Sequence, residues 1–145
     1  MADRELASWG RRLAALLVDV VVLGLVIGVA LFAAGMSADE LRERLRDGET
    51  MLVVILFLIP EAIYHTALIG SRSQTFGKMA LGIRVVDAES NSPIGYMRAF
   101  RRWISTAALR ALFTLPTILD HLWPLRDSRN QTLHDKFARS VVVRT

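Results

Sequence analysis

The stretch Leu13–Ala34, LAALLVDVVVLGLVIGVALFAA, decides the fold class, because Asp19 is its only charged residue. As an α-helix it would be roughly 33 Å long, which is enough to cross the hydrocarbon core of a bilayer. A soluble domain would spread its apolar residues at helix or strand period instead of gathering them in such a block. We therefore predict an all-α membrane protein whose first transmembrane helix covers residues 13–34.

A second apolar block follows at Met51–Ile69, MLVVILFLIPEAIYHTALI. It would reach roughly 28 Å as a helix, and Pro60 near its middle predicts a kink. Between the two blocks, Ser37-Ala-Asp-Glu40 has the spacing of a capping box and predicts a short polar helix at the membrane surface. The sequence therefore contains two long spans joined by a polar connection.

A third block, Ile104–Leu125, is less clear because it is interrupted by charged residues and prolines: Arg110, Pro116, Asp120, His121 and Pro124. It can form a straight span, or a re-entrant hairpin broken near Pro116 and covered by protein. A straight span would carry the basic tail across the membrane, against the positive-inside rule. We favour the hairpin, or a shallow pair of helices, over the straight span.

The distribution of basic and acidic residues predicts on which side of the membrane the ends of the chain lie. Basic residues precede the first span, including Arg4, Arg11 and Arg12, and they recur in the loop 70–103, whereas the connection 37–50 has more acidic than basic residues. The positive-inside rule therefore predicts that the N-terminus, this loop and the tail 126–145 are cytoplasmic. In the loop, Ile83–Asp87 and a following turn predict a strand, and Ser140–Arg144 predicts another. These strands would pair into a small cytoplasmic β element within a single domain, 1–145.

Composition excludes several functions. Among the 145 residues 52% are hydrophobic, 22% are charged and none is cysteine, and the net charge is +4. In a membrane protein this charge reports topology, so we expect no nucleic acid as a partner. The histidines, at 65, 121 and 134, have no metal-ligand spacing, and Met79 follows Gly77-Lys78 where a phosphate-binding loop needs Ser or Thr. We predict no enzyme activity, no cofactor and no metal site.

Charged residues inside the apolar blocks are the candidate site. Asp19 and Arg110 lie at nearly the same predicted depth, so we expect them to be partners, either as a structural pair or in ion conduction. Glu61 and His65 share one face of the second span and resemble a proton relay. A structural alternative is that Glu61 is neutral, or binds the backbone freed by Pro60.

Two further features predict partners besides the lipid bilayer. Gly24 and Gly28 form a GxxxG pattern, with Gly35 near the same face, which favours contact with another helix, in a homo-oligomer or with another membrane subunit. The basic residues of the second loop, with Lys78 in a glycine turn, favour contact with anionic lipid at the cytoplasmic face.

Three stretches together resemble the RDD family of small integral membrane proteins: Trp9–Asp19 (WGRRLAALLVD), Gln74–Val86 (QTFGKMALGIRVV) and Gln131–Ala138 (QTLHDKFA). The resemblance implies that the family's arginine and two aspartates are Arg12, Asp19 and Asp135. It also marks the loop residues Gln74, Thr75, Gly77, Lys78 and Gly82. Where the family usually has Gly-Thr before its last strand, this sequence has Arg139-Ser140.

The resemblance implies a membrane domain, in a bacterial cell membrane, for which ion transport or assembly of membrane complexes would be expected. From the residues themselves we expect Asp135 to accept hydrogen bonds from an arginine or from the backbone of the Gln74–Gly82 loop. We predict a non-catalytic accessory or assembly subunit. The alternative is a small oligomeric cation/proton transporter that uses intramembrane acidic residues.

Overall fold

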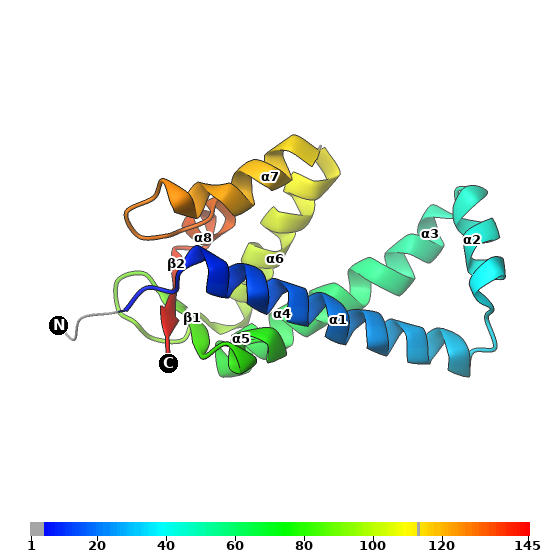
Figure 1. Ribbon diagram of the computed structural model, residues 1–145, viewed down its shortest axis with the longest axis horizontal. Coiled ribbons are helices and arrows are strands. Elements are labelled where there is room, and N and C mark those ends of the chain that lie inside the picture. Colours follow the sequence, from blue (N-terminus) through cyan, green and yellow to red (C-terminus); the bar gives the residue numbers. More distant parts are fainter. Residues whose placement is uncertain (1–4, 113) are drawn as a thin grey trace.

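The computed structural model of the protein describes residues 5–112 and 114–145, so Arg4 lies outside the described residues. It consists mainly of helices, with two short strands near the end where the described chain starts and finishes (Figure 1). In chain order the elements are α1 (Trp9–Ala33), α2 (Ala38–Arg46), α3 (Thr50–Val53), η1 (Val54–Leu58), α4 (Ile59–Arg72), α5 (Phe76–Ala80), β1 (Ile83–Asp87), α6 (Gly95–Leu112), α7 (Thr114–Leu122), η2 (Trp123–Leu125), α8 (Leu133–Phe137) and β2 (Ser140–Arg144).

The first predicted span is one continuous helix, α1, with a mean hydropathy of 2.8 in its most apolar window. It begins before the apolar block, because the hydroxyl of Ser8 accepts the N–H of Arg11 and caps the helix. It ends before Gly35, whose φ of +70° lies in the left-handed region that favours glycine. Only 11% of the apolar window is buried, whereas a core helix of a soluble protein would be mostly covered.

The second predicted span runs through α3, η1 and α4, and its part from Val54 to Arg72 has a mean hydropathy of 1.6. The segment η1 is π-helical and ends at Leu58, two positions before Pro60. Proline has no N–H to donate and its ring crowds the preceding turn, so the helix widens there. The disturbance predicted at Pro60 thus takes the form of a π-helical segment. The helix then continues past Ile69 to Arg72, where Ser73 adopts a φ of 60° and ends it.

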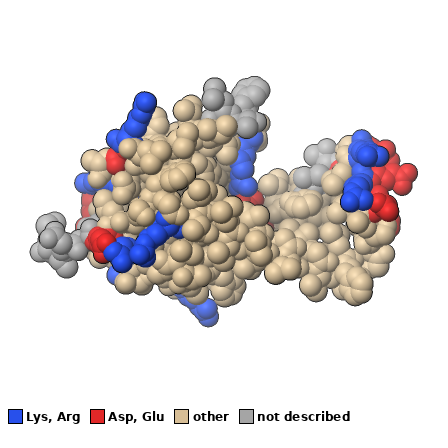
Figure 2. All heavy atoms as spheres, viewed as in Figure 1, with Lys and Arg blue, Asp and Glu red and all other residues tan. Residues whose placement is uncertain are grey.

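The short polar helix predicted between the spans is α2, at the end of the molecule remote from the strands (Figure 1). The hydroxyl of Ser37 accepts the N–H of Glu40, as the capping box requires, but the Glu40 carboxylate binds Arg44 instead of the cap. On the face drawn in Figure 2, Lys, Arg, Asp and Glu gather over α2 and over the main body. The outer half of α1 between them has none of these colours, as expected for a surface in contact with lipid.

The third block does not form a straight helix. It is divided between α6, which begins at Gly95, and α7, which leaves α6 at an angle and leads back toward α8 (Figure 1). The described part of the third block therefore changes direction between α6 and α7, and whether this block crosses the membrane or re-enters it stays a prediction. Pro116 lies within α7.

The two predicted strands pair antiparallel, with Val85 opposite Val142 and Asp87 opposite Ser140. Leu6 adds a bridge to Val143, and the N–H of Arg144 donates to the carbonyl of Glu5 over 2.9 Å. The segment before α1, the loop after α4 and the C-terminal tail therefore meet in one small sheet. The predicted pairing of residues 83–87 with residues 140–144 is confirmed.

The core lies under this sheet and not between the long helices. Its fully buried apolar members come from the sheet, from the start of α1, from the end of α4 and from α6: Ala7, Ala15, Ile69, Ile83, Val85, Ile94, Ala99 and Val142. By contrast, Leu25 and Phe32 in the outer half of α1 are 65% and 86% exposed. The chain therefore has a packed, partly polar end and an apolar end that requires a bilayer or a partner.

Candidate functional site

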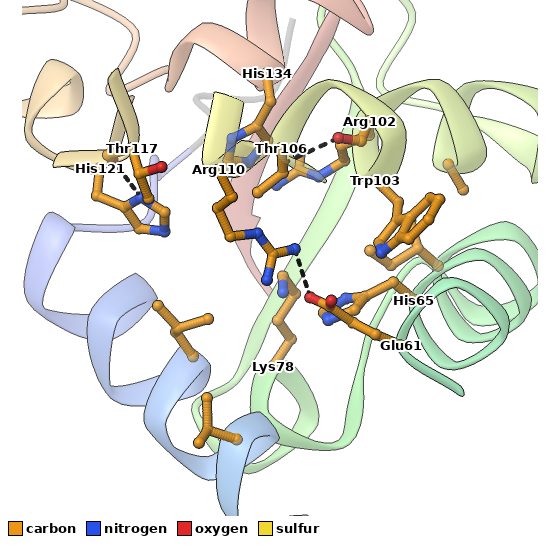
Figure 3. A pocket seen from close by; sticks show the side chains of 14 residues that line it. Glu61, His65, Lys78, Arg102, Trp103, Thr106, Arg110, Thr117, His121 and His134 are labelled. Carbon is orange, nitrogen blue, oxygen red and sulfur yellow. Dashed lines mark hydrogen bonds and ion pairs between the residues drawn. The ribbon is translucent and has the colours of Figure 1, made fainter. Parts of the chain in front are cut away.

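Side chains from α1 and from α4 through α8 enclose a cavity of about 330 Å³ (Figure 3). Its apolar wall includes Leu16, Val20, Ile69 and Ala99. The ionisable residues that line it are Glu61, His65, Lys78, Arg102, Arg110, His121 and His134. A cavity with so many ionisable groups beside two apolar helices is the most distinctive chemical feature of the described chain.

The partner of Arg110 is Glu61, whose Oε1 lies 2.6 Å from Nη2 of Arg110 (Figure 3). The expected pair of Asp19 and Arg110 is wrong. Sequence spacing estimates the depth of each residue, but it does not say which side of a helix faces which neighbour. Because α6 packs against α4, Arg110 meets the acidic residue of the second span and not that of the first.

Glu61 and His65 both line the cavity, so the face predicted for them is confirmed. His65 also packs edge-on against the ring of Tyr64, with the ring centroids 5.2 Å apart. Glu61 is held in an ion pair, whereas His65 makes no hydrogen bond in the part of the chain that the structure describes. The two residues are thus placed as a relay would require, one turn apart on α4.

All three histidines of the chain line this one cavity, although they are far apart in sequence. His134 is tied to Asp120, whose carboxylate accepts from Nδ1 over 2.6 Å and from the His134 backbone N–H over 3.0 Å. Nδ1 of His121 lies 2.9 Å from the carbonyl of Thr117. Burial and the nearby Arg102 lower the pKa of His134, while Asp120 opposes that shift. The described residues contain no group of three side chains arranged to hold a metal ion.

Asp19 is buried beside the cavity, and each of its carboxylate oxygens has protein donors. Oδ1 accepts from the Tyr64 hydroxyl and from the Gly77 backbone N–H, both over 2.7 Å. Oδ2 accepts from the Thr75 hydroxyl over 2.6 Å and lies 3.7 Å from the ammonium of Lys78. These donors satisfy both oxygens of the buried carboxylate. Asp19 therefore fastens α4 and α5 to α1.

The loop Gln74–Gly82 is built to reach Asp19. Thr75 caps α5 by accepting the N–H of Lys78, and the amide of Gln74 donates to the carbonyl of Ile83 over 3.0 Å. Gly82, with a φ of +60°, accepts the N–H of Thr145 and so joins the loop to the tail. We expected this loop to offer backbone donors to Asp135. This was one of two alternatives for Asp135, the other being an arginine, and the loop instead turns toward α1 and donates to Asp19.

Asp135 forms a second buried cluster, and here the predicted arginine partner is confirmed twice. Its carboxylate binds Arg12 of α1 over 2.5 Å and Arg102 of α6. It also accepts the N–H of Thr132 over 3.1 Å, which completes a capping box at the start of α8. Burial alone would raise the pKa of Asp135, but Arg102 and Arg12 outweigh it and hold that pKa well below the usual range.

Comparison with known proteins agrees with this arrangement. A model of the RDD family matches residues 6–139, which is nearly the whole chain. The chain belongs to the RDD family. Comparisons with curated proteins and with solved structures found no match. With its two long apolar helices, this RDD protein is a membrane protein.

In this RDD protein the three residues inferred as the family motif hold the fold together at the sheet end. Arg12 and Asp135 join α1 to α8, and Asp19 joins α1 to α5. Arg12 and Asp19 do not bind each other, as their separation of two helical turns predicts. Three residues of these clusters have no sequence pattern that predicts their partners. They are Tyr64 as a donor to Asp19, Arg102 as a second partner of Asp135, and Asp120 as the partner of His134.

The glycines of α1 have no neighbour at the positions where a Cβ would point. An added Cβ would meet nothing within 4 Å at Gly24, Gly28 or Gly35, leaving aside the backbone of α1 itself. No described part of this chain fills the predicted small-residue face. The expected helix contact therefore requires a second molecule.

The basic residues of the loop 70–103 do not form a flat surface for binding lipid. The side chains of Lys78 and Arg102 are only 14% and 9% exposed, and both line the cavity. Arg98 pairs with Asp87, and the guanidinium of Arg101 lies over the ring of Phe137 at 5.3 Å. Burial and Arg102 lower the pKa of Lys78 to about 8. The side chains of Lys78 and Arg102 thus face the cavity.

Proposed function

We propose that this RDD protein is a non-catalytic subunit that assembles with a second membrane chain through the glycine face of α1. The observation that carries the proposal is the empty space beside Gly24 and Gly28 on an exposed apolar helix. Small residues let two helix backbones approach closely in a bilayer, where packing replaces the hydrophobic effect as the driving force. The partner is a second copy of the chain or the apolar helix of another subunit.

Cross-linking tests this proposal directly, because the chain has no cysteine of its own. Gly28→Cys should form an oxidised dimer in native membranes if copies meet at this face, and Val26→Cys on the opposite face should not. Native mass spectrometry of gently extracted protein then tests for a different subunit. A chain that stays monomeric in both experiments contradicts the proposal.

The proposed location is a bacterial cell membrane, with both ends of the chain in the cytoplasm. Support comes from the sheet, which holds residues 5–7 beside the C-terminal strand, and from the acidic excess in the remote connection around α2. Single cysteines at Ser90 and at Glu43 should label from opposite sides of the membrane. Labelling of both from the same side would contradict the orientation.

A second candidate function, a small oligomeric cation/proton transporter, is favoured by one specific observation. Glu61 and His65 face the same cavity from within an apolar helix, and both can exchange protons. Two long helices are too few to enclose an ion pathway within one chain, so transport would need an oligomer. Proton flux in proteoliposomes should then fall with Glu61→Gln and stay unchanged with Arg72→Gln, an exposed residue at the end of α4. Equal flux in both variants would exclude Glu61 from such a path.

A further inference from the structure

We propose that the cavity binds the phosphate group of an anionic ligand, with Lys78 and Arg102 as its cationic contacts. This inference does not depend on the proposed assembly through α1, because it concerns a different part of the molecule. The ligand is either an anionic phospholipid, with its headgroup in the cavity, or a soluble phosphate. The two sources share the chemistry that the cavity would recognise.

The charges that face the cavity are unequal in number. Lys78, Arg102 and Arg110 line it, against Glu61 as the single carboxylate among the lining residues that the structure describes. Glu61 is already bound to Arg110. Asp19 pairs with Lys78 and Asp135 pairs with Arg102, but both carboxylates are buried and lie outside the lining. An anion entering this space therefore meets two cations and no competing free carboxylate.

The two cations retain donors for a ligand. Both hydrogen bonds of Arg102 in the described structure use Nη1, which leaves Nε and Nη2 for another acceptor. The ammonium of Lys78 makes one hydrogen bond in the described part of the chain, to Thr75 over 3.3 Å, and lies 3.7 Å from Oδ2 of Asp19 without a hydrogen bond to it. A planar guanidinium and a mobile ammonium are the usual combination around a phosphate.

The pKa values of Lys78 and His134 are consistent with an anionic ligand in the cavity. Burial and the neighbouring Arg102 lower the pKa values of both Lys78 and His134, so the positive charges here repel one another across a poorly solvated space. A bound anion would relieve that repulsion and raise both pKa values. The other charged or titratable groups around Lys78 come from every adjoining element: Arg12, Asp19, Glu61, His65, Arg110, His121 and Asp135.

The shape of the cavity suits an anion with an apolar attachment. Its inner wall is formed by buried residues of the core end, such as Ile69 and Ala99. Its outer part is bordered by Val20, which is 59% exposed on the apolar surface of α1, and by the partly exposed His121 of α7. A phosphate could bind inside while an acyl chain continued along α1. A volume of about 330 Å³ is also far larger than one halide ion requires.

The test measures thermal unfolding of the full chain in nanodiscs of phosphatidylcholine. In one arm inorganic phosphate replaces chloride at constant ionic strength, and in the other phosphatidylglycerol replaces part of the phosphatidylcholine. We expect one or both additions to raise the Tm of the wild type, and the required concentration to rise at least five-fold in Lys78→Gln. Arg72→Gln removes an exposed cation outside the cavity and should respond like the wild type. Stabilisation in the second arm alone identifies a lipid headgroup.

The wild type provides a second measurement in case Lys78→Gln does not fold. Stabilisation by the addition that raises the Tm should weaken as the pH rises through about 8, because Lys78 loses its proton there. Lys78→Arg keeps its charge and should keep its stabilisation above that pH. The proposal is overturned if neither addition raises the Tm, if Lys78→Gln and Arg72→Gln respond alike, or if the wild type shows no weakening between pH 7 and 9.

Discussion

The backbone N–H of Gly77 donates to Oδ1 of Asp19 over 2.7 Å, although 58 positions separate the two residues in sequence. This contact brings α5 so close to α1 that position 77 has no space for a side chain. A Cβ added at Gly77 would lie 2.0 Å from the carbonyl oxygen of Ala15 and 2.8 Å from Oδ1 of Asp19. The glycine is required by the approach of two backbones and not by its dihedral freedom.

Gly77→Ala should therefore destabilise the protein by about 3 kcal/mol, since α5 must move away from α1 and the hydrogen bond to Asp19 is lost. Thermal unfolding in a mild detergent measures the effect. The matched control is Gly10→Ala in the same packed half of the molecule, because nothing lies within 4 Å of a Cβ built there. That control should be neutral or slightly stabilising. Equal stability of the two variants would show that α5 does not pack as described.

Asp19→Asn should destabilise the fold by about 3 kcal/mol, because it removes a buried charge that faces Lys78 and replaces one accepting oxygen with a donor. Tyr64→Phe removes only one of the donors to Asp19 and should cost about 1 kcal/mol. Chemical unfolding of both variants measures the difference. Full stability of Asp19→Asn together with loss of ion flux would instead favour the transporter.

Stability should fall in acid because of Asp135. Its pKa is lower in the folded protein than in the unfolded chain, where an aspartate titrates near 3.9. The folded state therefore holds fewer protons on this group than the unfolded state does. The resulting stabilisation is fully present above about pH 5 and is lost progressively as the pH falls toward the folded pKa. Unfolding measured from pH 7 down to pH 3 should show this decline.

Asp135→Asn serves as the comparison for that acid titration. It should be less stable at pH 7, because Arg12 and Arg102 lose their shared carboxylate. Its stability should also change less between pH 5 and pH 3 than that of the wild type. Asp87, whose pKa is lowered by its hydrogen bonds to Ser90 and by Arg98, contributes to the slope in both proteins and cancels in the comparison. Parallel pH profiles would assign the acid sensitivity to other groups.

The pair of Glu61 and Arg110 should be coupled. Removing either partner leaves the other charge beside an apolar helix, so Glu61→Gln and Arg110→Gln should each destabilise the protein. The double variant should be less damaged than the sum of the two single variants, by about 1 kcal/mol, because the pair is partly exposed. A double-mutant cycle on unfolding free energies measures this coupling. Additive effects would show that the two side chains do not interact.

Features that depend on neighbouring residues along the chain were predictable from sequence. The apolar block 13–34 indicates a span because its length matches a bilayer, and the β-branched residues of Ile83–Asp87 and Ser140–Arg144 indicate strands. Their pairing followed from placing both on one side of the membrane. Asp135 was expected to accept hydrogen bonds from an arginine or from the Gln74–Gly82 loop, and Arg12 and Arg102 are the partners observed.

The rest depends on how helices rotate about their axes. Asp19 and Arg110 match in predicted depth, yet each faces a different neighbour, and the hydrophobic pattern of an almost uniformly apolar helix does not define its rotation. The convergence of His65, His121 and His134 has the same cause, because it needs the angle between α6 and α7.

The link between Arg12 and Asp135 spans 123 positions of the chain and sets an order of events during synthesis. At about 5–20 residues per second, a ribosome needs roughly 6 to 25 s to reach Asp135 after it has made Arg12. Throughout this interval α1 can already occupy the bilayer, but Arg12 has no Asp135 carboxylate to bind. The ion pair that joins α1 to α8 can therefore close only after Asp135 has been synthesised, whereas α1 can enter the bilayer earlier.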